Sequence, residues 1–134
     1  MKVVIDTNIF VSSFFGGNPK KIIDLWKTGQ ITLCLSDSIL EEYIQVLQRL
    51  SLKHEAELEE LLALFAKGIN TLFTKKTPDF NLIEEDPGDD KFIECAVALK
   101  ASYIITGDKA FESFGSYMRI KILSPHKFLE IFKK

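Results

Sequence analysis

Short apolar runs alternate along the chain with longer segments whose apolar residues recur at helical spacing. The β-branched run at residues 3–5 is followed by Asp6, Thr7 and Asn8, residue types that favour the start of a helix. The runs predicted to be strands are 3–5, 32–35, 71–74 (as an edge strand), 103–106 and 120–123.

Helices are predicted between these strands. The clearest one follows the second strand, because Ile39, Tyr43, Val46 and Leu47 fall on one helical face. The others are expected over 9–15, from about 19 to 29, across 58–69, from 89 to 99, over 109–114 and from 124 onward. Strands that alternate with helices form β-α-β units, so the pattern predicts an α/β fold whose mostly parallel sheet is covered on both faces.

Length and composition narrow the class of protein. The chain has 134 residues, 46% hydrophobic and 27% charged, which predicts one globular domain over residues 1–134. No apolar run approaches the ~20 residues of a membrane span, and Asp6 comes too early for a signal peptide, so a cytoplasmic protein is expected. Cys34 and Cys95 lie in apolar segments and are expected to be reduced core residues. The net charge of −2 means that binding of nucleic acid would need a local basic patch or a metal ion.

Acidic residues follow the predicted strands at one edge of the sheet. Asp6 ends the first strand, Glu42 lies on the helix after the second, and Asp108 comes two residues after Thr106. A fourth acidic position, Asp89 with Asp90, opens the helix that leads into residues 103–106. Helix capping, the helix dipole and turn formation could explain all of these acids except Glu42.

Glu42 is the most informative of these acids. At about 100° per residue it flanks the apolar face of its helix, whereas Glu41 points away. No base is an obvious partner, since Arg49 is seven residues further on, and we therefore expect a bound cation beside Glu42. Oxygen ligands without His or Cys select hard cations such as Mg²⁺ or Mn²⁺, and phosphoryl chemistry is the leading use of such a site.

The acids and their surroundings resemble the motifs of PIN-domain nucleases. The opening Val-Val-Ile-Asp-Thr-Asn places Asp6, the segment around Glu42 supplies the second acid, and Asp86-Pro-Gly-Asp-Asp90 supplies the third. Ile-Thr-Gly-Asp108 supplies the fourth, and the resemblance covers essentially the whole chain.

The resemblance implies a three-layer α/β/α fold with a five-stranded parallel sheet, and an Mg²⁺- or Mn²⁺-dependent ribonuclease. Small members of the family are toxins, which implies an antitoxin partner and a homodimer. In this interpretation the four acids are both catalytic residues and metal ligands: Asp6, Glu42, Asp90 and Asp108. Asn8 and Thr106 match supporting positions that orient carboxylates, and Asp89 or Asp86 could share the role of Asp90.

Two lysines directly follow acids of this set, Lys91 and Lys109, and both are expected at the rim as contacts for the RNA backbone. A haloacid-type phosphatase is disfavoured, because Asn8 stands where that family needs its second aspartate. A response-regulator receiver is also disfavoured, because it needs paired acids at the first strand. A non-cleaving PIN-fold module that binds RNA or protein remains the alternative.

Overall fold

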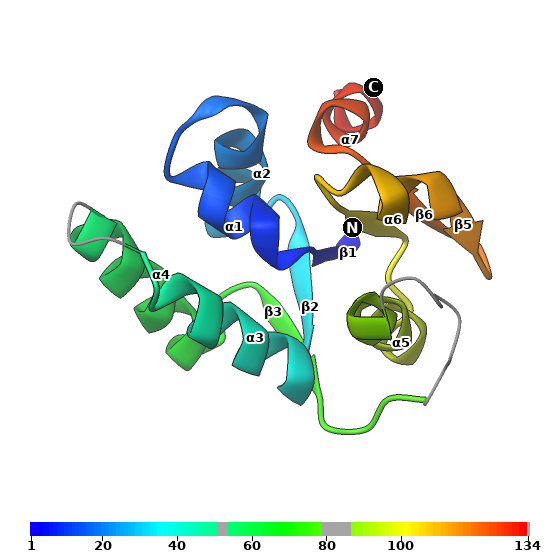
Figure 1. Cartoon of the computed structure of the whole chain (residues 1–134), viewed down its shortest axis with the longest axis horizontal. Coiled ribbons are helices and arrows are strands. Elements are labelled where there is room, and N and C mark those ends of the chain that lie inside the picture. Colours follow the sequence, from blue (N-terminus) through cyan, green and yellow to red (C-terminus); the bar gives the residue numbers. More distant parts are fainter. Residues whose placement is uncertain (51–53, 79–86, 134) are drawn as a thin grey trace.

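The computed structural model describes residues 1–50, 54–78 and 87–133 of the chain, drawn in Figure 1. The elements in chain order are β1 (Lys2–Ile5), α1 (Thr7–Ser13), α2 (Gly17–Lys27), β2 (Thr32–Ser36), α3 (Asp37–Leu47), α4 (Glu55–Lys67), β3 (Thr71–Thr74), the 3₁₀ turn η2 (Pro87–Asp89), α5 (Asp90–Leu99), β4 (Tyr103–Ile105), α6 (Lys109–Phe114), β5 (Ser116–Tyr117), β6 (Ile120–Leu123) and α7 (Pro125–Phe132). None of these helices is long and apolar enough to cross a membrane.

In the described part of the chain the sheet has six strands in the order β3-β2-β1-β4-β6-β5, and every neighbouring pair is parallel except β5 with β6. The predicted mostly parallel α/β sheet is therefore confirmed, but the strand number of five is wrong. The additional strand, β5, has only two residues and no apolar run. It pairs through a tight hairpin in which Met118 and Arg119 both have positive φ, 48° and 72°.

Helices cover both faces of the sheet. α5 packs against β1, β2, β3 and β4 on one face, while α1 to α4 pack together on the other and α2 also contacts α7 (Figure 1). The four-helix side is held by a ring cluster, in which Phe10 lies 4.7 Å from Tyr43, 5.7 Å from Trp26 and 5.4 Å from Phe65 between centroids. Each of these rings comes from a different helix, so the cluster fixes α3 relative to α1.

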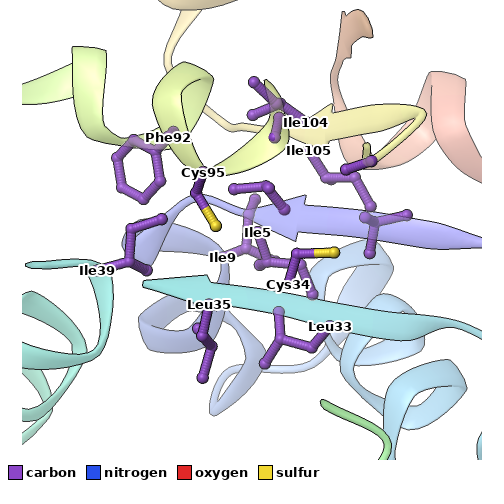
Figure 2. Close-up of a cluster of buried hydrophobic side chains, with 14 of the residues drawn as sticks. Ile5, Ile9, Leu33, Cys34, Leu35, Ile39, Phe92, Cys95, Ile104 and Ile105 are labelled. Carbon is purple, nitrogen blue, oxygen red and sulfur yellow. The ribbon is translucent and has the colours of Figure 1, made fainter. Parts of the chain in front are cut away.

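Successive side chains along each strand point to opposite faces of the sheet, so apolar residues fill the core on both sides. Figure 2 shows Leu33 and Leu35 of β2 on one side of the sheet and Phe92 and Cys95 of α5 on the other. Both cysteines are buried free thiols, as the sequence predicts. Burial raises the pKa of Cys34 to about 11 and that of Cys95 to about 12, so both stay protonated and unreactive at neutral pH.

The strand order reverses between β1 and β4. The chain runs outward from β1 to β2 and β3, then crosses to β4 on the other side of β1 and continues to β6. In parallel sheets a crevice opens at the carboxyl ends of the two strands that flank such a reversal. Asp6 directly follows β1, and Thr106 directly follows β4.

Candidate active site

Asp6 and Thr106 meet at the point where the strand order reverses. The Thr106 hydroxyl donates a hydrogen bond of 2.6 Å to Asp6 Oδ2, and the Asp6 backbone N–H donates to the Ile105 carbonyl at 2.9 Å. Asp6 is only 5% exposed and Thr106 only 1%. Asp6 occupies the N-cap position of α1, but its carboxylate also bonds to Thr106, which lies outside that helix. Capping alone therefore does not explain Asp6.

The environment of Asp6 disfavours its negative charge. Burial is the largest cause and raises the pKa of the carboxyl group above its ordinary value. The Thr106 hydroxyl and the nearby Asn8 backbone amide act in the opposite direction, while the charges of Glu42 and Asp108 raise the pKa further. Asp6 thus lies within electrostatic reach of two other predicted site acids.

Asp108 is anchored by the same threonine. Its backbone N–H donates to Thr106 Oγ1 at 3.0 Å, so one hydroxyl bonds with both Asp6 and Asp108. Asp108 Oδ1 also caps α6 by accepting from the Ala110 N–H at 2.9 Å. The capping role and a place near Asp6 therefore coexist in one residue.

Glu42 has partners that the sequence did not indicate. Lys91 Nζ lies 2.8 Å from Glu42 Oε1, and the Thr7 hydroxyl donates to Glu42 Oε2. The prediction that no base pairs with Glu42 is wrong, because α5 brings Lys91 to α3 from a position distant in sequence. The Lys91 ammonium also donates to the Gly88 carbonyl at 2.7 Å, so this predicted RNA contact is bound to Glu42 and Gly88 in the structure.

Tyr43 links the backbone beside Asp6 to the helix that carries Glu42. Its hydroxyl donates to the carbonyl of Ile5, and the side chain is fully buried. Burial raises the pKa of Tyr43 well above its ordinary value, and the charges of Asp6 and Glu42 add to this effect. The helical spacing places Tyr43 on the apolar face of its helix, but the sequence carries no signal for this hydrogen bond.

The remaining predicted residues occupy different settings. Asp90 is the first residue of α5 and is 5% exposed, and Asp89 precedes it at the N-cap position, half-buried and without a side-chain capping bond. Asn8 is exposed and lines a cavity instead of contacting the carboxylates through its side chain. Lys109 is exposed at the start of α6, and Asp86 lies outside the described residues.

The fit to a divalent cation can be judged from the donors. In the part of the chain that the structure describes, no three His, Cys, Asp or Glu side chains form a group that could hold a metal ion as they stand. The contacts account for this, because Lys91 and Thr7 hold both oxygens of Glu42 and α6 holds one oxygen of Asp108. The donor chemistry nevertheless fits a hard cation, since all candidate ligands are carboxylates and Glu42 already binds a positive charge, the Lys91 ammonium.

The chain is similar to a known protein family and to a known archaeal protein. The family model described as PIN domain matches residues 2–110. The chain is also similar to the uncharacterized protein MJ1680 of Methanocaldococcus jannaschii, with 35% identity over 148 aligned residues that cover all of this chain and 93% of the relative. The matched family range contains Asp6, Glu42, Asp90 and Asp108.

Proposed function

This chain belongs to the PIN-domain family, whose members are generally nucleases, and from that premise we propose that it hydrolyses RNA phosphodiester bonds with Mg²⁺ or Mn²⁺. The observation that carries the proposal is the Thr106 hydroxyl, which bonds to Asp6 and to the backbone of Asp108 where the strand order reverses. A buried carboxyl group whose pKa is raised by burial and by neighbouring acids, as that of Asp6 is, is typical of functional sites.

In this proposal Asp6, Glu42, Asp90 and Asp108 hold the cation. A bound divalent ion would supply Lewis acidity at the scissile phosphate and stabilise the charge that develops there. Thr106 keeps the Asp6 carboxylate in one orientation, and the cap of α6 does the same for Asp108. Glu42 must exchange Lys91 for the cation, which leaves the Lys91 ammonium available to an RNA phosphate beside the site. Lys109, exposed beside Asp108, contributes a second positive charge at the rim.

The test is cleavage of a mixed RNA pool by the purified protein. We expect cleavage with Mg²⁺ or Mn²⁺, loss of cleavage in EDTA, and recovery when the metal is restored in excess. Asp6→Asn serves as the inactive control, because it keeps the shape of the side chain and removes its charge. Cleavage that continues in EDTA, or that Asp6→Asn retains, would refute the proposed metal-dependent mechanism.

The same proposal includes a biological role as the toxin of a toxin–antitoxin pair in the cytoplasm. The family resemblance supports this role, and Phe15, 73% exposed at the end of α1 and in ring contact with His54, offers an apolar contact for a homodimer or an antitoxin. Expression of the chain should arrest growth, and co-expression of an adjacent reading frame should relieve the arrest. The Asp6→Asn variant should cause no arrest.

One observation favours the alternative of a PIN-fold module that binds RNA or protein without cutting. The Lys91 ammonium already neutralises Glu42, so the charge of this acid is balanced without metal. A module of this kind would bind RNA equally well in EDTA and in Mn²⁺ and would leave the RNA intact. A metal-dependent product ladder decides between the two functions.

A further inference from the structure

A cavity of about 550 Å³ opens beside the acids, and the function proposed above makes no use of it. It lies between α1 and α2 on one side and the start of α7 on the other (Figure 1). Two proline rings, Pro19 and Pro125, add apolar surface to a polar lining that comes from Asn8, Ser12, Asn18, Ser124 and His126. Its volume falls in the range of sites that bind small molecules.

The cavity lies next to the edge of the sheet at which Asp6, Thr106 and Asp108 meet. Gly107 lines it and lies between Thr106 and Asp108 in the chain. Asn8 also lines it, and the backbone amide of the same residue is close enough to Asp6 to lower its pKa. A nucleotide bound next to a phosphate at Asp6 could therefore place its base in the cavity.

The lining chemistry suits a base better than a phosphate. Among the residues that the structure describes, no Lys, Arg, Asp or Glu lines the cavity, so its lining lacks the lysine or arginine charge that binds a phosphate group. The two asparagine amides each offer donors and an acceptor, which match the edges of an unpaired base. The imidazole of His126 adds a flat ring for stacking, and its Nε2 lies 2.7 Å from Glu130 Oε1, which orients the ring.

We propose that this cavity binds one unpaired nucleobase of the RNA, adjacent to the scissile phosphate, and so gives cleavage a base preference at one position. The proposal rests on the proposed ribonuclease function. Asn18 and His126 are the specificity-determining residues, because both line the cavity. Neither is hydrogen-bonded to Asp6, Glu42 or Asp108, so replacing them should leave these acids in place.

The first measurement needs no activity. The metal-free wild-type protein in EDTA is titrated with adenosine, guanosine, cytidine and uridine, and binding is followed by ¹H–¹⁵N NMR. We expect one or more nucleosides to shift the Asn18 side-chain amide and the backbone signals around His126. The double variant Asn18→Ala/His126→Ala has no Asn18 amide to observe, and it should lose the nucleoside-induced shifts of the backbone signals around residue 126. Lys127→Ala is the matched control on the same helix, because Lys127 is exposed and does not line the cavity. This control should keep them.

The second measurement is cleavage of RNA with randomised sequence. We expect the wild type to prefer one base next to the cut, and the double variant to lose that preference with KM raised about five- to tenfold and kcat little changed. The base site is refuted if the wild type cleaves RNA but nucleosides shift no NMR signals and the double variant keeps the same base preference. The nuclease proposal would still stand in that case. Nucleoside binding without any RNA cleavage has the opposite meaning, since the base site stands and the nuclease proposal fails.

Discussion

Replacing Tyr43 with Phe removes one hydroxyl from the centre of the fold and tests how the two halves of the site are joined. The hydroxyl donates to the carbonyl of Ile5, the residue before Asp6. The paired register of β1 and β2 ends at Val3 with Leu33, so this carbonyl lies beyond the paired part of the two strands. The ring itself would stay in place, because it packs against Phe10 and Phe65 at 4.7 and 5.6 Å between centroids.

The expected cost follows from the lost bond. Tyr43 is 0% exposed, so no water replaces the donor and the carbonyl is left without this partner, which costs about 1–3 kcal/mol of unfolding free energy. For a chain of this length, 1 kcal/mol corresponds to roughly 4 °C in Tm, so Tyr43→Phe should melt about 4–12 °C lower. The cleavage rate should also fall, because the link between the backbone beside Asp6 and that beside Glu42 is lost.

Thermal melts in EDTA measure the effect, and Tyr103→Phe is the matched control. Tyr103 lies half-buried on β4 against Phe128, with 5.6 Å between ring centroids, and its hydroxyl has no hydrogen bond within the described residues. Its replacement should change unfolding free energy by less than about 0.5 kcal/mol. Equal changes in Tm for the two variants would show that the Tyr43 hydroxyl holds nothing in place.

Three further results are expected. Asp6→Asn should inactivate the enzyme yet raise Tm in EDTA at pH 7 by roughly 3–5 °C, about 1 kcal/mol, because the amide can still accept from Thr106 while the disfavoured charge is gone. Because the folded-state pKa of Asp6 is raised, its contribution to stability is complete below its ordinary pKa of about 3.9 and is lost as the pH rises through the folded-state pKa. The difference in Tm between the variant and the wild type should therefore shrink in acid. A lower Tm for Asp6→Asn than for the wild type at pH 7 would contradict this prediction. Glu42→Gln should nearly abolish cleavage whereas Glu41→Gln should not, since Glu41 is exposed and about 100° away on the helix; equal losses in the two assays would count against the site. Mg²⁺ or Mn²⁺ should support activity and raise the Tm of the wild type more than that of Asp6→Asn, while Zn²⁺ should support little cleavage; a clear preference for Zn²⁺ in a metal series would exclude the oxygen-ligand site.

Much of the fold could be predicted because its parallel strands are short apolar runs. β1, β2, β3, β4 and β6 each carry such a run, and alternation with helices was enough to imply a parallel sheet. β5 could not be predicted, because a two-residue strand is defined by its hairpin and not by a pattern. The helix expected over 9–15 spans Thr7–Ser13, because it begins directly after Asp6 and not after Asn8.

The site was less predictable than the fold. Strand ends were expected to gather Asp6 and Asp108, and Thr106 does connect them. The ion pair between Glu42 and Lys91 was missed, because the two residues lie far apart in sequence and meet only where α3 approaches α5. Helical spacing gives the face on which a residue lies, but it carries no information about which distant element covers that face.

The hydroxyl of Thr106 preorganises the acids of the crevice before any substrate binds. A hydroxyl has a single proton, and here that proton goes to Asp6 while the lone pairs receive the Asp108 N–H. Asp6 and Asp108 are therefore both held by hydrogen bonds to one oxygen atom, directly after the central strand β4. A central strand is among the stiffest parts of an α/β protein. The relative placement of the two acids is set when the sheet forms, so little ordering entropy remains to be lost when RNA binds.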